Sequence, residues 1–285
     1  MSTVGLELRI PGYALEGLAG SGTYSKVYRA RRESDGRRVA IKALDQDLVD
    51  YSQDLKYASD LQDIASPYIA SLLEHGRTPD GTWFLVLEWA GVELYDWIET
   101  RGALGVADAY LAAYQATEGV RALQRARFFH LDISPGNLFA DETGNISVCD
   151  FGMCVRIVGR ARKLDGRPRG TPGFTAPEVM KGRAHIASDV FSLGASLHWM
   201  LTGKPPLGDD DGKKPRGIVP GLPEPAEWIL QKALDPKPEG RFQTLAELSH
   251  HLKLALDGTW TRPSSRPTDR GSKRAPKSLW RRWIS

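Results

Sequence analysis

The spacing of apolar residues changes character once along the chain, near residue 90. Before that point, short runs typical of β-strands stand at 27–30, 38–41 and 83–87. The Ser34–Gly36 segment has turn composition and joins the first two runs. Between Lys42 and Pro67, apolar residues recur at near-helical spacing and predict one helix. This part is therefore predicted to be an antiparallel sheet with one helix packed on it.

After Leu94 the apolar period is mostly helical, through 106–128, 187–202 and 224–254. The last pattern stops at Asp257-Gly258, and the segment that follows is rich in Pro, Ser and Arg and has no apolar period. The pattern predicts an α+β chain, with a small β-rich part before a larger α-helical part and a domain boundary near 258.

Composition is that of an ordinary globular protein, with 41% hydrophobic and 26% charged residues. We expect a cytoplasmic location, because the chain has no apolar run of 18 residues, no signal-like start and only two cysteines, Cys149 and Cys154. Residues 258–285 hold eight basic side chains against one acidic, whereas the rest of the chain has 30 basic and 34 acidic. The predicted tail is therefore basic and the body mildly acidic.

A glycine-rich loop begins at Gly20, with Ser25 in the place of its third glycine. A strand, not a helix, follows this loop, which argues against a dinucleotide-binding fold and for a hairpin tip whose backbone N–H groups cover phosphates. Lys42 ends the apolar strand Val39–Lys42. It is either an ordinary solvated lysine or, in this context, the partner of the α- and β-phosphates of ATP.

The most informative segment is HLDISPGN, residues 130–137, followed thirteen residues later by Asp150-Phe151-Gly152. Phosphoryl transfer needs a carboxylate to orient the attacking hydroxyl and hard oxygen ligands to hold Mg²⁺ against the phosphates. Asp132, Asn137 and Asp150 supply that set. Two short predicted strands between Asn137 and Asp150 allow both residues to reach one cation.

From about Tyr13 to Leu256 the chain resembles the eukaryotic-like protein kinase family, of the serine/threonine type found in bacteria. The segments GSGTYSKV, VAIK, HLDISPGN, DFG and APE stand where the family has GxGxxGxV, VAIK, HRDxKxxN, DFG and APE. GTPGF at 170–174, SDVFSLG at 188–194 and Arg241 are further landmarks. The resemblance implies a two-lobed protein kinase fold, with ATP in the cleft under the glycine loop.

The resemblance also implies the domain limits and the site. The kinase domain would occupy 13–257, with the small lobe ending at about 90, an N-terminal extension at 1–12 and a flexible basic tail at 258–285. Catalysis is expected from Asp132, Lys42, Asn137, Ser134 and Thr171; nucleotide binding from Gly20, Ser21, Gly22, Ser25, Val27, Ala40, Lys42, Leu87, Glu88, Ala90 and Phe139; and Mg²⁺ or Mn²⁺ binding from Asn137 and Asp150. Structural roles are implied for Asp189 as an anchor of the catalytic-loop backbone, for a Glu178–Arg241 pair, and for a stack of Leu61, Leu72, His130 and Phe151.

Three positions depart from the family pattern. Leu131 replaces the arginine that binds an activation-loop phosphate, and Ser134 replaces the lysine that faces the γ-phosphate. The helix glutamate expected to pair with Lys42 falls on Tyr57, and Asp54 or Asp60, one turn away on either side, are alternative partners.

Three functions follow from these features. The first is an ATP- and Mg²⁺-dependent serine/threonine kinase acting on protein hydroxyls, since Gly170-Thr171 before APE is the serine/threonine pattern. The second is a pseudokinase scaffold, which the departures at Ser134 and Tyr57 favour. The third is a small-molecule phosphotransferase. Enzymes of that type share the HxDxxPGN outline, but they lack the APE, GTPGF and SDVFSLG segments that this chain has.

The tail adds an expectation about partners. It ends in LWRRWI, residues 279–284, where apolar and aromatic residues bracket two arginines. Such a segment can lie on an anionic membrane surface, dock on an acidic partner or remain disordered. No nucleic-acid recognition module accompanies its charge.

Overall fold

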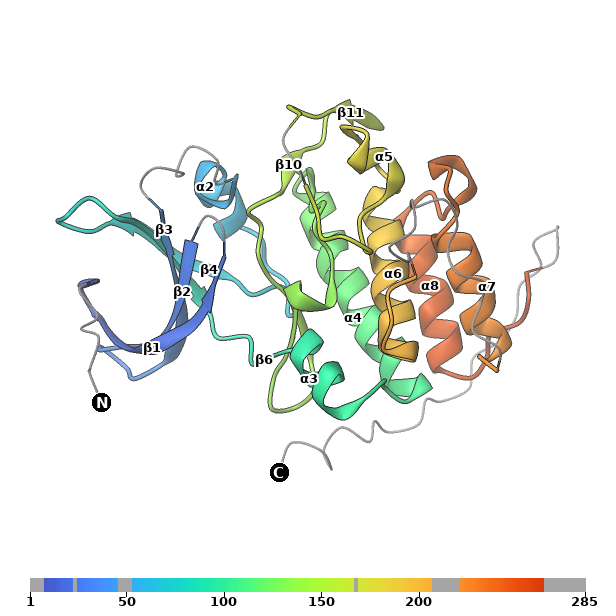
Figure 1. The fold of residues 1–285 in the computed structure, drawn as a ribbon, viewed down its shortest axis with the longest axis horizontal. Helices are drawn as coiled ribbons and strands as arrows, with labels where there is room; N and C mark the ends of the chain where they lie inside the picture. The colour runs from blue at the N-terminus through green and yellow to red at the C-terminus, as the bar shows by residue number, and fades with distance from the viewer. Residues whose placement is uncertain (1–7, 23–24, 46–52, 167–168, 207–220, 264–285) are drawn as a thin grey trace. The chain divides into compact units, whose positions relative to one another are not determined.

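The computed structural model describes residues 8–22, 25–45, 53–166, 169–206 and 221–263 (Figure 1). The chain divides into two compact units. The N-terminal unit comprises Met1–Ser66 and Ala70–Trp89, and the C-terminal unit comprises Pro67–Ile69 and Ala90–Ser285. No helix in the described ranges is long and apolar enough to cross a membrane.

The N-terminal unit is a five-stranded antiparallel sheet in the order β1-β2-β3-β5-β4 (Figure 1). Its strands are β1 (Tyr13–Ser21), β2 (Ser25–Arg32), β3 (Arg38–Leu44), β4 (Leu72–Arg77) and β5 (Trp83–Glu88). The three strands that the sequence predicts are confirmed as β2, β3 and β5.

The alternation of side chains along β3 separates a core face from a functional face. Val39 and Ile41 are fully buried and form a core with Tyr13, Ala30, Phe84 and Val86, among others. Arg38, Ala40 and Lys42 point to the other face of the strand. The register places Val27 opposite Lys42 and Arg29 opposite Ala40, so these β2 residues share that face.

The helical stretch of this unit differs from the prediction. The structure has two short helices, α1 (Gln53–Lys56) and α2 (Ala58–Gln62), with Tyr57 between them. Leu44, which contributes to the predicted helical period, belongs to β3 and lies opposite Ser25. The one predicted helix is thus present as two short helices, and Leu44 belongs to the preceding strand because a short apolar run fits a buried strand and a helix equally well.

The C-terminal unit is mainly helical. Its helices are α3 (Leu94–Arg101), α4 (Val106–Arg125), α5 (Pro177–Met180), α6 (Ser188–Thr202), α7 (Glu224–Ala233) and α8 (Leu245–Leu256). Helix α4 packs against both α6 and α8, and α7 packs against the same two helices (Figure 1). Gly194 permits the α6–α7 contact, since a Cβ atom there would lie 2.6 Å from that of Ala233.

The predicted helical spans 106–128 and 187–202 are confirmed by α4 and α6. The span 224–254 is instead divided into α7 and α8, with a short 3₁₀ turn at Pro238–Gly240 between them. Pro236 and Pro238 explain the interruption, because proline lacks the N–H that a helix interior requires.

Three small sheets complete the C-terminal unit. Strand β8 (Leu138–Ala140) pairs with β6 (Val92–Glu93) and β9 (Ile146–Val148); β7 (Phe128–Phe129) pairs with β10 (Val155–Arg156); and β11 (Ala161–Lys163) pairs with β12 (Arg183–His185). The β8–β9 hairpin confirms the predicted strands between Asn137 and Asp150.

The chain remains packed for several residues beyond α8. The Trp260 ring lies 5.7 Å from that of Trp228, and Arg262 forms an ion pair of 2.7 Å with Glu224. The packed domain therefore continues past 257. Residues 264–285, which hold most of the predicted tail, lie outside the described residues.

Candidate active site

The backbone of the catalytic loop is held by one buried carboxylate. Asp189 at the start of α6 accepts hydrogen bonds from the N–H of His130, at 3.1 Å, and of Leu131, at 3.0 Å. Leu131 has a φ of 65°, a conformation that is unfavourable for a side chain with Cβ. The two bonds to Asp189 hold that conformation, which confirms the predicted anchor and fixes the position of Asp132.

His130 is a structural histidine, not a base. Its Nδ1 accepts the N–H of Asp132 at 3.3 Å, so the ring proton resides on Nε2, which faces the carbonyl oxygen of Cys149 at 3.2 Å. The ring packs edge-on against Phe151, with centroids 5.6 Å apart. His130 and Phe151, two of the four residues of the predicted stack, are thus in contact within the C-terminal unit. The other two, Leu61 and Leu72, are buried in the N-terminal unit.

The carboxylate of Asp132 contacts two other residues of the predicted catalytic set, Thr171 and Asn137, and Ser134 lies beside Thr171. Thr171 Oγ1 donates to its Oδ1 at 2.7 Å, and Asn137 Nδ2 donates to its Oδ2 at 3.1 Å and to its carbonyl oxygen at 2.8 Å. Ser134 Oγ lies 3.4 Å from Thr171 Oγ1. Burial raises the pKa of Asp132, and the hydrogen bond from Thr171 opposes that shift. The carboxylate is directed toward a hydroxyl donor, which suits a group that must orient an attacking alcohol.

Asn137 and Asp150 offer oxygen ligands for a cation. Asn137 spends its amide nitrogen on Asp132, which leaves its side-chain carbonyl oxygen as an acceptor. Asp150 has a φ of 56° and accepts the N–H of Gly152 at 3.0 Å. A bond of 2.9 Å from Cys149 N to Asn137 O ties the two segments together. Hard oxygens of this kind fit Mg²⁺, which takes few protein ligands and completes its shell with phosphate oxygens and water. The described residues contain no cluster of three or more His, Cys, Asp or Glu that could hold a metal ion.

In the N-terminal unit the predicted nucleotide residues lie on one sheet face. Val27, Ala40 and Lys42 share it, and Lys42 is only 8% exposed. Gly20 and Ser21 end β1, and Gly22 donates to Ser25 O at 2.9 Å. Thr23 and Tyr24, at the tip of the glycine loop, lie outside the described residues.

The end of β5 carries two more of the predicted nucleotide-binding residues, Leu87 and Glu88. Leu87 lies opposite both Ala40 of β3 and Leu72 of β4. Glu88 donates its N–H to Ser71 O at 3.0 Å, and its carboxylate pairs with the guanidinium of Arg37. Ala90 and Phe139 belong to the C-terminal unit, where Phe139 lies opposite Glu93 in the β6–β8 pair.

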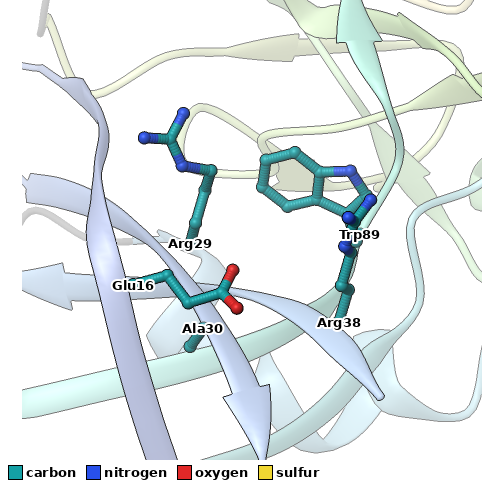
Figure 2. Close-up of a pocket in the computed structure, with 5 residues that line it drawn as sticks. All are labelled: Glu16, Arg29, Ala30, Arg38 and Trp89. Carbon is teal, nitrogen blue, oxygen red and sulfur yellow. The ribbon is translucent and has the colours of Figure 1, made fainter. Parts of the chain in front are cut away.

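A pocket of about 290 Å³ opens in the N-terminal unit, on the face that carries Ala40 (Figure 2). It is lined by Glu16, Arg29, Ala30, Arg38 and Trp89. Figure 2 shows the Trp89 ring and the Arg29 guanidinium on opposite sides of the hollow. The hollow is therefore lined by an aromatic ring, two cations and one carboxylate.

The described part of the activation segment, residues 150–178, is held by contacts within the segment and with the neighbouring strands β7 and β12. Strand β10 pairs with β7, β11 pairs with β12, and Arg162 donates to Arg156 O at 2.7 Å. Arg169, with a side chain only 3% exposed, donates to Met153 O at 2.8 Å and pairs with Asp165 at 3.0 Å. These bonds link the start of the segment to Arg169 near its end.

Comparison with known proteins agrees with this geometry. Residues 13–273 match the family described as protein kinase domain. The chain belongs to that family. The kinase domain is 31% identical over 273 residues to the DNA damage-responsive serine/threonine-protein kinase RqkA of Deinococcus radiodurans, covering 87% of this chain and 40% of that protein. It is 31% identical to the serine/threonine-protein kinase PknB of Mycobacterium tuberculosis (86% and 43%), and 30% identical to the maternal embryonic leucine zipper kinase of Xenopus tropicalis (84% and 38%). The chain therefore spans about two fifths of the length of these relatives.

The APE segment of the kinase domain is fixed by a buried ion pair. Arg241 donates to both carboxylate oxygens of Glu178, at 2.7 and 2.8 Å, and its side chain is fully buried. Burial raises the pKa of Glu178, but the hydrogen bonds from Arg241 and Ser188 and the charge of Arg241 together outweigh it, so that the pKa is lowered. The predicted pair is confirmed.

The position expected to pair with Lys42 lies between the two short helices. Tyr57 lies outside both helical ranges, and Lys56 Nζ approaches its ring at 5.3 Å from the centroid. Asp60 is exposed, and the side chain of Asp54 lies outside the described part of the chain.

Sequence reasoning missed two residues of the kinase domain. Glu93 Oε1 lies 3.2 Å from where a Cβ of Gly136 would stand, so this carboxyl group borders the catalytic loop. Burial, with a smaller effect of Asp96, raises its pKa to about 7. The second residue is Arg169. Its structural role could not be told from the sequence, because it is one of several arginines in the same segment. Neither had a local signal, because both depend on contacts with other segments.

Proposed function

We propose that this protein is an ATP- and Mg²⁺-dependent serine/threonine kinase that transfers the γ-phosphate of ATP to hydroxyl groups of proteins. The observation that carries the proposal is the Asp132 carboxylate, oriented by Asn137 and bonded to a threonine hydroxyl at 2.7 Å. Membership of the protein kinase domain family and similarity to proteins named serine/threonine-protein kinases support it.

The residues have separate roles in this proposal. Asp132 orients the substrate hydroxyl, whose oxygen forms a bond to the γ-phosphorus while the bond to the β–γ bridging oxygen breaks and ADP leaves; the hydroxyl proton passes to Asp132. Lys42 contacts the α- and β-phosphates. The Thr171 hydroxyl and the Asn137 amide keep the carboxylate in place.

Mg²⁺ would be bound by Asn137 and Asp150, because their side-chain oxygens are the hard ligands that this ion prefers. When bound, the ion neutralises charge on the phosphates. Mn²⁺ suits the same oxygen ligands. The hydrogen bond from the Gly152 N–H orients the Asp150 carboxylate.

The test is transfer of labelled phosphate to a generic protein acceptor by the full chain, with ATP and Mg²⁺ or Mn²⁺. Lys42→Met, Asp132→Asn and Asp150→Ala should each lower the rate at least about a hundredfold, because each removes a group that positions phosphate, hydroxyl or metal. Near-full activity of Asp150→Ala would overturn the proposal.

A pseudokinase is the second candidate, and the observation in its favour is Ser134 in place of a lysine. Ser134 is 3% exposed and carries no charge that could compensate a transferring phosphate. Nucleotide binding without transfer in the same assay would support this candidate. Transfer only to small molecules would instead indicate a small-molecule phosphotransferase, a reading that the Glu178–Arg241 pair in the APE segment disfavours.

We also propose a cytoplasmic enzyme whose basic tail binds anionic membrane surfaces or an acidic partner. The tail hydroxyls that follow Arg262, among them Ser265, Thr268 and Ser272, should be autophosphorylated, because a tether gives them a high effective concentration at the active site. Phosphopeptide mapping and sedimentation with anionic vesicles test this. Phosphates confined to the domain before 258, with no vesicle binding, would contradict it.

A further inference from the structure

The β11–β12 hairpin places two cations directly against each other. Lys163 lies opposite Arg183 in the antiparallel register, and both side chains are exposed. They point away from the fully buried Ala184, since neighbouring residues of a strand face opposite sides. Like charges opposite each other destabilise a strand pair. Packing of the hairpin therefore does not explain why both positions are basic.

The two carboxylates of the same segment are paired with arginines outside this group of exposed cations. Residues 153–185 contain eight Lys or Arg and two acidic residues, Asp165 and Glu178. Asp165 pairs with Arg169, and Glu178 pairs with Arg241. Among the residues of this segment that the structure describes, the exposed cations are Arg160, Lys163, Lys181 and Arg183, which we call the cationic hairpin.

No member of the cationic hairpin forms an ion pair with a carboxylate among the described residues. Arg160 donates to the neutral amide oxygen of Gln243 at 2.9 Å and keeps its charge. Two exposed apolar side chains lie beside these cations in the chain, Val158 at 65% and Met180 at 57% exposure. The surface thus combines positive charges that no described carboxylate pairs with and two exposed apolar side chains beside them in the chain.

This surface is within reach of the catalytic carboxylate. Leu164 donates to Gly182 O at 2.8 Å, which closes the hairpin, and Thr171 follows seven residues later. Seven residues span at most about 25 Å. Because Thr171 is bonded to Asp132, an extended peptide with its hydroxyl at Asp132 reaches the hairpin within about eight residues.

We propose that the cationic hairpin binds an acidic segment of the protein substrate, so that the kinase prefers Ser or Thr residues with Asp or Glu within about eight positions. The inference rests on the proposed kinase function and adds the substrate class. Charge complementarity selects the occupant, since an acidic peptide supplies the carboxylates that the hairpin lacks. The chain's own tail is excluded because it is basic.

The experiment uses the full chain and three peptides that share one serine and differ only in flanking Glu, Gln or Lys residues. Phosphorylation is measured as kcat/KM, and binding is measured separately by fluorescence anisotropy without ATP. We expect the acidic peptide to exceed the basic one at least about tenfold in both, with the difference shrinking at high salt.

Charge reversal then locates the effect. Lys163→Glu/Arg183→Glu should lose the preference for the acidic peptide and gain one for the basic peptide, while the neutral peptide is unaffected. Lys204→Glu, an exposed site in the same unit, is the matched control for Lys163→Glu and should change nothing. The gain on the basic peptide separates recognition from damage to the fold.

The outcomes distinguish this inference from the proposed function. Equal phosphorylation of all three peptides would overturn the inference and leave the kinase function intact. Hairpin-dependent binding of the acidic peptide without any transfer would retain the surface but refute the kinase function. An acidic preference that survives the double reversal, or tighter hairpin-dependent binding of a single-stranded oligonucleotide, would overturn the assignment of the hairpin to acidic peptides.

Discussion

The hydroxyl of Thr171 donates to the carboxylate of Asp132 at 2.7 Å, across 39 residues of sequence. The bond joins the activation segment to the catalytic loop. Thr175 supports it by donating to Thr171 O at 2.8 Å, and Gly170 leaves the space, since a Cβ there would lie 2.2 Å from Thr175 Oγ1. Asp132 therefore depends on a residue that lies outside its own loop.

Removal of that hydroxyl should slow the chemical step. A hydrogen bond to a charged group contributes about 1.5 to 3 kcal/mol. Thr171→Ala should therefore lower kcat on the order of 10 to 150-fold. Thr171→Ser, which keeps the hydroxyl, should retain most of the rate. Steady-state kinetics on one peptide decide this, and equal rates for the alanine and serine variants would show that the bond has no catalytic role.

The activation segment should need no phosphate to be ordered. Between Gly152 and Gly170 there is no Ser, Thr or Tyr, and Leu131 cannot bind a phosphate. Arg169 instead holds Met153 O and Asp165, so Arg169→Ala should lower the free energy of unfolding by about 1.5 to 3 kcal/mol and increase proteolysis of the segment.

Asp165→Asn serves as the control for Arg169→Ala, since it keeps the hydrogen-bond acceptor and should have a smaller effect. Phosphatase treatment should leave activity unchanged. Loss of activity together with loss of a phosphate mapped to Thr171 or Thr175 would refute this account.

The substitutions at Ser134 and Tyr57 should have different kinetic effects. A lysine at 134 would add a charge-assisted hydrogen bond to the transferring phosphate, so Ser134→Lys should raise kcat about 10 to 150-fold with little change in the KM for ATP. Tyr57→Glu should change ATP affinity as well as turnover, because an ion pair with Lys42 increases the population of the competent state. Ser134→Ala is the matched control. If neither substitution speeds an active enzyme, other groups already fill these roles; if neither rescues an inactive one, the pseudokinase gains support.

Stability should depend on pH through Glu93. Its folded-state pKa of about 7 lies above that of the unfolded chain, so the folded state binds the extra proton in the interval between those values. Stability from this group is therefore present at acidic pH and is lost as the pH rises through 7. Glu93→Gln should have a higher Tm than the wild type at pH 8, and the difference should vanish toward pH 5. A Tm difference of constant size across that range would contradict the raised pKa.

Much of the fold and of the site could be predicted from the sequence, because it depends on local chemistry. The strands β2, β3 and β5 and the helices α4 and α6 could be predicted, because their apolar periods are long or their turns are explicit. Asp132, Asn137 and Asp150 could be chosen because phosphoryl transfer needs hard oxygens at close spacing. The resemblance supplied Asp189 and the Glu178–Arg241 pair, which the structure places in contact with their expected partners.

Only the tertiary structure decided the rest. The division of one predicted helix at Tyr57 and of another at Pro236 and Pro238 depends on backbone geometry that periodicity does not encode. The burial that raises the pKa of Glu93 comes from surrounding segments, and so do the contacts that order Arg169. Lys163 and Arg183 are twenty residues apart and become neighbours through the register of β11 and β12. Desolvation and pairing are sums over contacts distant in sequence, and for that reason they follow from the fold and not from the order of residues.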